Sequence, residues 1–270
     1  MRKRVYKGRV AGCLIAGCLI SAVGCASVPK PPTDASPEER LRYGYRLLEK
    51  GSTYAAKQVF EELIYSAPGS AIIDSVHFGL AEAYFLEDNF YQAQVEYEIV
   101  VSSYPRSSLV DNAAYKVGLC YWEQSLSYRL DQTETRKAIA AFEVFLLDYP
   151  GSEWTDEAAD YFYRCREKLA RKLLYQGTTY SKLGTEGDLR AALLALQELM
   201  QLYPDSSYIG EALWWMGEAF YRLDRHQEAV VAYGALVRDY ADSKRVRAAR
   251  ERLKELGSLS GGISAPPPRS

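Results

Sequence analysis

Histidine is scarce in this 270-residue sequence, and the common catalytic and metal-binding motifs are absent. His77 and His226 are the only two histidines, and there is no His-Glu-x-x-His motif, no paired Cys-x-x-Cys motif and no glycine-rich phosphate loop. Without these motifs a hydrolytic or metal site would need carboxylates alone, and the carboxylates here follow the pattern of solvated helix faces. We therefore predict that the chain is not an enzyme, holds no metal and binds no cofactor.

Long apolar runs are also absent, except for a short one near the N-terminus. Five positive charges and no negative charge lie within residues 1–9, and an apolar run from Val10 to Gly24 follows. At about 15 residues this run is short for a bilayer span, which needs about 20. A basic start followed by a short apolar run is typical of a secretory signal peptide. We predict a signal peptide over residues 1–24, with an uncleaved membrane anchor as the alternative.

The apolar run ends in Ala22-Val23-Gly24-Cys25, which resembles the lipobox of bacterial lipoproteins. We predict that Cys25 carries a covalent diacylglyceryl group and an N-acyl chain, and that residues 25–36 form a flexible tether rich in proline. Cys18 also follows lipobox-like residues, but cleavage there would leave an exposed apolar stump. Because Ala26 rather than Asp follows Cys25, we expect the protein on the periplasmic face of the outer membrane.

The net charge argues against nucleic-acid partners, and the cysteine content bears on disulfide formation. Loss of the signal peptide removes five of the 33 basic residues, leaving 28 against 35 acidic residues, a net charge of about −7. A chain of this charge is not expected to bind nucleic acid, and it is held to the membrane by lipid. Two cysteines remain after Cys25, Cys120 and Cys165. Their spacing requires no pairing, so we expect both to be reduced and unlinked.

A short loop motif recurs five times along the body at intervals of 37 to 54 residues. A small residue lies upstream of each motif, at Ala56, Ala93, Ala138, Ala192 and Ala229, and a large apolar residue follows it by four positions. This pattern is typical of tetratricopeptide repeats, in which two helices approach closely at the small residues. We therefore predict an all-α protein, an α-solenoid of five helical hairpins. The five motifs are Ser66-Ala-Pro-Gly-Ser70, Tyr104-Pro-Arg-Ser107, Tyr149-Pro-Gly-Ser152, Tyr203-Pro-Asp-Ser206 and Tyr240-Ala-Asp-Ser243.

Two repeats depart from the common length. The third has about eight extra residues between its helices, and the fourth begins with a long helix from about Thr155 to Leu183. A charged helix suited to capping follows the fifth repeat, and the tail beyond it has a composition typical of disorder. The predicted units are repeats at about 37–70, 74–107, 111–152, 155–206 and 208–243, a capping helix at 244–256 and a tail at 257–270.

The first helices of repeats one to three predict an apolar concave groove. Residues three before, one after and four after each small position line the groove in this repeat class, and eight of these nine are apolar or aromatic. An apolar surface of this kind suggests a bound peptide. The alternative is that tighter packing of the superhelix or the N-terminal tether covers the groove. The predicted peptide-binding residues are Tyr45, Phe78, Glu82, Phe85, Tyr115, Leu119 and Trp122.

The two departures from the common repeat length resemble one family. The stretch from Tyr128 to Pro150 is similar to the third repeat of the BamD family, lipoproteins of the outer-membrane β-barrel assembly machine. The run Cys165-Arg-Glu-Lys-Leu-Ala-Arg171 resembles the start of the long helix in its fourth repeat. Ala241 stands where the repeat usually has proline. The resemblance implies binding to POTRA domains of the barrel protein BamA, association with other lipoproteins of the machine, and contact with C-terminal strands of unfolded outer-membrane proteins.

Other functions remain open on the sequence. A tetratricopeptide lipoprotein that serves pilus assembly or the cell-wall divisome is the main alternative. A periplasmic enzyme with an appended repeat array is a third class, but the repeats leave no region for a catalytic domain.

Overall fold

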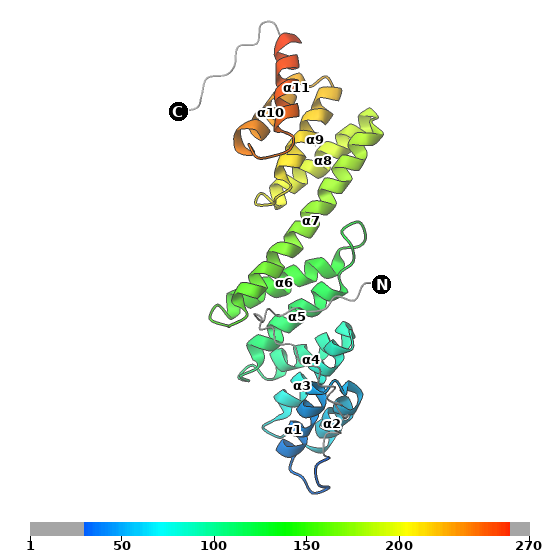
Figure 1. Ribbon diagram of the computed structural model, residues 1–270, viewed down its shortest axis with the longest axis vertical. Coiled ribbons are helices and arrows are strands. Elements are labelled where there is room, and N and C mark those ends of the chain that lie inside the picture. Colours follow the sequence, from blue (N-terminus) through cyan, green and yellow to red (C-terminus); the bar gives the residue numbers. More distant parts are fainter. Residues whose placement is uncertain (1–29, 260–270) are drawn as a thin grey trace, which may run out of the picture.

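A computed structural model describes residues 30–259, which form eleven α-helices and no β-strand. The helices follow one another along a single long axis, with α1 at one end and α11 at the other (Figure 1). No helix in this part of the chain is both long enough and apolar enough to cross a bilayer. The helices are α1 (Pro37–Glu49), α2 (Thr53–Ser66), α3 (Ile73–Leu86), α4 (Phe90–Ser103), α5 (Val110–Gln124), α6 (Thr133–Asp148), α7 (Thr155–Leu183), α8 (Glu186–Leu202), α9 (Ile209–Arg222), α10 (His226–Asp239) and α11 (Val246–Leu259).

The helices form an α-solenoid because small residues let consecutive helices come together. The side chain of Phe60 lies so close to Gly44 and Gly79 that a Cβ atom on either glycine would sit 2.5 or 2.6 Å from its ring. The same close approach brings together three further pairs: Gly118 and Phe142, Gly177 and Leu196, and Gly217 and Tyr233. The large residue four positions after each small alanine therefore fills the space within a hairpin, and Phe60 also reaches the next hairpin.

Side-chain hydrogen bonds stabilise both ends of the solenoid. Ser36 caps α1 with a capping box: its hydroxyl accepts from the Glu39 backbone N–H, and the Glu39 carboxylate accepts from the Ser36 N–H. At the other end, α11 continues through residues 257–259, so the predicted tail begins later than its sequence suggested. The Ser258 hydroxyl donates to the carbonyl of Glu255, which stabilises this last turn. The predicted signal peptide, Cys25 and the remaining tail lie outside the described residues.

The long helix α7 joins the two halves of the solenoid (Figure 1). It has 29 residues and ends at Leu183, and the capping residue Gly184 has a φ of 82°, in the left-handed region that favours glycine. The side chain of Arg222 on α9 donates to the carbonyl oxygens of Ser181 and Gly184, which satisfies acceptors at the helix end. The long helix expected from the sequence therefore has a defined stop, supported by the next hairpin.

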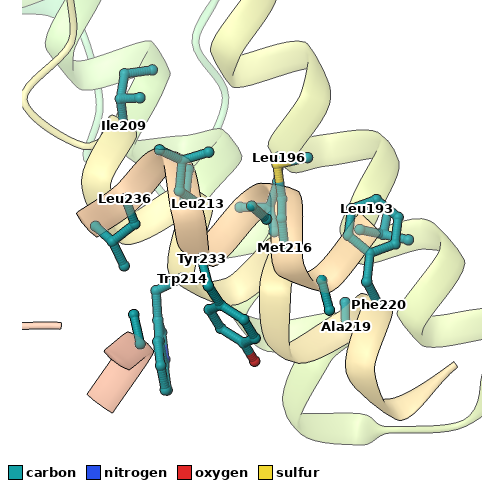
Figure 2. Packing of buried hydrophobic residues seen from close by; sticks show 14 of the residues in the cluster. Leu193, Leu196, Ile209, Leu213, Trp214, Met216, Ala219, Phe220, Tyr233 and Leu236 are labelled. Carbon is teal, nitrogen blue, oxygen red and sulfur yellow. The ribbon is translucent and has the colours of Figure 1, made fainter. Parts of the chain in front are cut away.

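The buried residues form four clusters rather than one core. Three smaller clusters follow one another along α1 to α7, and a larger one runs through α7 to α11. Figure 2 shows part of the larger cluster, where Trp214 and Tyr233 lie beside Leu213 and Leu236. Cys120 and Cys165 are buried in separate clusters and both are free cysteines, as expected.

Candidate functional site

Three of the seven predicted groove residues belong to the core. Phe78, Tyr115 and Leu119 are only 7%, 1% and 5% exposed. Phe78 meets the edge of the Tyr97 ring, with centroids 5.4 Å apart, and Tyr115 stacks on Trp154 at 5.1 Å. The prediction that these three residues line an open groove is wrong. The hairpins pack tightly enough to bury these positions in the clusters of residues from neighbouring helices.

Tyr45 is half-buried, because it contacts both its own hairpin and the next one. Its hydroxyl donates to the carbonyl of Ser75 over 2.7 Å, and its ring meets the edge of Phe60 at 5.5 Å. Burial is the main reason that the pKa of Tyr45 lies above its usual value, with the Glu82 and Asp74 charges adding to the effect. Tyr45 therefore keeps only part of its side chain accessible.

Glu82 forms an internal ion pair instead of facing an open groove. Its carboxylate accepts a hydrogen bond from the Tyr97 hydroxyl and lies 2.9 Å from the Lys116 ammonium. These three side chains come from α3, α4 and α5, so the ion pair joins two hairpins. Burial and the Glu82 charge raise the pKa of Tyr97 well above its ordinary value. Glu82 therefore acts within the fold.

Phe85 and Trp122 keep partly open aromatic surface. Phe85 meets the edge of Phe90 at 5.2 Å, and the Lys116 ammonium lies 4.8 Å from its ring centroid. Trp122 lies 4.9 Å from the charged groups of both Arg164 and Lys168 on α7. A cation that stacks on an indole ring is held by the negative face of the π-system. Together with Tyr45, these two residues are what remains of the predicted groove.

Trp122 also forms one wall of a cleft that the sequence analysis did not predict. The cleft has a volume of about 710 Å³ and lies between the end of α5, the α5–α6 loop and α7. Its charged side chains include cations and carboxylates, and three tyrosines contribute to its walls. The lining residues are Trp122, Glu123, Ser125, Leu126, Ser127, Tyr128, Tyr163, Arg164, Glu167, Lys168, Arg171 and Tyr208.

The loop that forms the cleft is held from inside by Gln132. This fully buried side chain donates from Nε2 to the carbonyls of Ser127, Leu130 and Asp131, and its Oε1 accepts from the Thr135 hydroxyl. These bonds satisfy a buried amide completely and so fix the loop. The insertion in repeat three is therefore an ordered loop that forms one wall of the cleft.

Two lysines of α7 attach the helix to this loop. The Lys168 ammonium donates to the Ser125 hydroxyl over 2.6 Å, and Lys172 donates to the carbonyl of Leu130 over 2.9 Å. Partial burial is the first cause that lowers the pKa of Lys168 below its usual value. The extra loop residues and the basic run on α7 were each visible in the sequence, but their meeting depends on how α7 crosses the third hairpin.

Within residues 30–259 no group of three or more His, Cys, Asp and Glu side chains is placed to hold a metal ion. His77, one of the two histidines, lies 2.7 Å from a Glu96 carboxylate oxygen and stacks on Tyr104. The cleft between the α5–α6 loop and α7 therefore offers aromatic rings, guanidinium groups and loop backbone to a ligand.

Sequence comparisons point to outer-membrane proteins. Residues 33–233 match the family model of YfiO, described as an outer membrane lipoprotein. An outer membrane protein assembly factor BamD of Caulobacter vibrioides is 27% identical over 232 residues, covering 84% of this chain and 75% of the relative. The BamD of Rickettsia prowazekii is 23% identical over 222 residues, covering 82% and 87%.

Solved structures were matched at lower similarity. A tetratricopeptide repeat protein from Parabacteroides merdae has a TM-score of 0.36 and 14% identity, covering 83% of this chain and 73% of that protein.

Proposed function

The chain belongs to the YfiO family of outer membrane lipoproteins, which includes BamD, and we propose that it is a non-enzymatic adaptor in the assembly of outer-membrane proteins. In this proposal the lipid on Cys25 holds the solenoid at the periplasmic face of the outer membrane. One part of the surface binds POTRA domains of a BamA-like protein, and another binds the C-terminal strands of unfolded barrel proteins. The two BamD relatives favour this role over pilus assembly or the divisome.

One observation carries the proposal: the solenoid keeps part of its aromatic surface accessible to solvent. Its relatives are assembly factors. A helical solenoid offers a long surface on which extended segments bind by their side chains. Phe85 and Trp122 are half-buried and lie on successive first helices, α3 and α5. Alternate side chains of a barrel strand are apolar, so such a strand presents suitable side chains to both rings.

Peptide binding tests the strand-binding part. A labelled peptide that ends in an aromatic residue is titrated with the full chain by fluorescence anisotropy, against the same peptide without its final aromatic residue. Because burying one aromatic ring contributes roughly 1.5–3 kcal/mol, the double variant Phe85→Ser and Trp122→Ser should weaken binding more than tenfold. Tyr65→Ser is the matched control, since Tyr65 is 87% exposed on α2. Equal binding of both peptides, or equal loss in variant and control, would contradict strand binding here.

The last two repeats support the partner-binding part. Leu194 on α8 and Val231 on α10 are 68% and 71% exposed, and Leu202 and Val230 are also open to solvent. Exposed apolar side chains of this kind are available for contact with a protein partner. Pull-down of purified POTRA domains should fall for Leu194→Asp with Val231→Asp and persist for Phe85→Ser with Trp122→Ser. The reverse result would place the POTRA contact in the first three repeats.

A further inference from the structure

The far end of the cleft, where the α5–α6 loop meets α7, concentrates positive charge on one tyrosine. The Arg171 guanidinium lies 4.2 Å from the Tyr128 ring centroid, and the Arg129 guanidinium lies 5.5 Å from the same centroid. Arg129 also donates from Nε to the Tyr128 hydroxyl over 3.1 Å and stacks on Tyr175 at 4.8 Å. Two guanidinium groups therefore share one half-buried ring.

These two arginines have no carboxylate partner within the part of the chain that the structure describes. Among the ion pairs of residues 30–259, none includes Arg129 or Arg171. The contrast is with α11, where Arg245 pairs with Glu211 and Arg252 pairs with Glu218. The two arginines also lower the pKa of Tyr128, first through the hydrogen bond from Arg129 and then through both guanidinium charges. Like charges held this close repel each other, so an anion between them would be stabilised.

The central carbon of each guanidinium lies over a tyrosine ring, Arg171 over Tyr128 and Arg129 over Tyr175. A guanidinium that stacks on a ring can still present two parallel N–H donors, the geometry that matches a carboxylate. Arg164 provides a second cationic position on the same helix. It stacks on Trp122 and Tyr161, and its ion pair among the described residues is an exposed one with Asp160, which a ligand can replace. The carboxylates of Glu123 and Glu167 limit this part of the cleft, and Glu167 is bound to the backbone and hydroxyl of Ser207.

The spacing along α7 sets the spacing of the ligand. Arg164 and Arg171 are seven residues apart, which is about 10 Å along a helix that rises 1.5 Å per residue. An extended chain covers about 10 Å in three residues. We propose that the Tyr128–Arg129–Arg171 end of the cleft binds a carboxylate of an acidic, extended segment of a partner protein, with a second acidic residue three positions away at Arg164.

The aromatic walls of the cleft favour a protein segment as its occupant. The cleft walls carry the Trp122 and Tyr163 rings, which suit side chains between the two carboxylates. The proposal rests on the proposed function only in assigning a partner surface to an adaptor, and it does not require that the chain binds barrel strands.

Peptide binding to the full chain, purified in detergent, tests this assignment. The probe is a labelled 12-residue peptide with Asp at every third position in a Gly and Ser background, and the comparison peptide has Asn at those positions. The Asp peptide should bind at least tenfold more tightly and should lose affinity when the salt concentration rises. Arg171→Gln should weaken binding at least fivefold, and Arg171→Lys, which keeps the charge, should weaken it less.

The matched control is Arg247→Gln, which removes the same charge from an arginine that is 92% exposed on α11. Circular dichroism confirms that each variant folds. Equal affinity for the Asp and Asn peptides, or equal loss in Arg171→Gln and Arg247→Gln, would overturn the proposal. Binding to phosphatidylglycerol vesicles without binding to the Asp peptide would also overturn it, and would assign the cationic cleft to lipid headgroups. The strand peptide and the Phe85 and Trp122 variants report on the proposed function separately.

Discussion

The two halves of the solenoid use the same three-residue contact in different surroundings. In the first half the Tyr97 hydroxyl donates to Glu82, which pairs with Lys116, and in the second half the Tyr233 hydroxyl donates to Glu218, which pairs with Arg252. The tyrosine follows its glutamate by 15 residues in both cases. The glutamate that follows the small residue of a first helix therefore makes internal contacts that join three helices. These contacts help to stack the repeats.

The cores of the two halves differ in continuity. Along α1 to α7 the buried residues divide into three clusters, each centred on one or two hairpins. From α7 to α11 a single cluster joins repeats four and five and the capping helix. A continuous cluster couples its helices, whereas separate clusters allow hairpins to unfold more independently. The difference predicts a modular first half and a cooperative second half.

Removal of a central tyrosine should break this comparison most clearly. Tyr97→Ala and Tyr233→Ala each delete a fully buried ring, and each should cost about 3–5 kcal/mol of unfolding free energy. We expect Tyr233→Ala to destabilise α8 to α11 together, and Tyr97→Ala to destabilise mainly α3 to α5. Hydrogen exchange measured by mass spectrometry locates the unfolded helices. Exchange that rises equally over the whole chain in both variants would contradict a modular first half.

Substitution of Glu82 or Glu218 should change the unfolding free energy less than loss of a tyrosine, and by different amounts in the two halves. Glu82→Gln keeps an acceptor for Tyr97 but leaves Lys116 without a carboxylate among its described contacts, so we expect a loss of about 1–3 kcal/mol. Glu218→Gln should cost less, because Arg252 keeps its ion pair with Glu255. Urea unfolding followed by circular dichroism measures both. A larger loss for Glu218→Gln would show that Glu255 does not compensate.

The two cysteines should give the smallest change in stability. Both lie in clusters of the first half, Cys120 on α5 and Cys165 on α7. Burial is the first cause that raises the pKa of Cys120 and Cys165 to about 12, whereas an exposed thiol has a pKa near 8.5. The folded chain keeps these protons as pH rises above about 8.5 while the unfolded chain loses them, so stability falls with rising pH. The loss at pH 9 is roughly 1 kcal/mol or less for each thiol.

Alkylation and unfolding at two pH values check this expectation. Both thiols should label under denaturing, non-reducing conditions and label slowly in the folded chain. The double variant Cys120→Ala and Cys165→Ala should lose less stability between pH 7 and pH 9 than the parent chain. Absence of labelling in denaturant would show that the two cysteines are linked or modified.

Local features of the fold were predictable because their causes lie close together in the sequence. The capping box of Ser36 and Glu39 needs only residues three apart, and the repeated small residues indicate which helix faces approach each other. The long α7 was predicted from a periodic pattern without a break until Gly184. The later end of α11 was missed because Gly257 and the serines near it favour loops, although the last turn has its own hydrogen bond.

Only the tertiary structure decided which aromatic residues are open. The sequence by itself determined an array of five hairpins with aromatic residues at regular positions, but the position one after the small residue is buried at Leu119 and half-buried at Tyr45. The twist between hairpins sets this difference, since it comes from the packing of many side chains across helices. The cleft has the same origin: Trp122 and Tyr128 meet Arg164 and Arg171 only because α7 crosses the ordered loop that Gln132 holds in place.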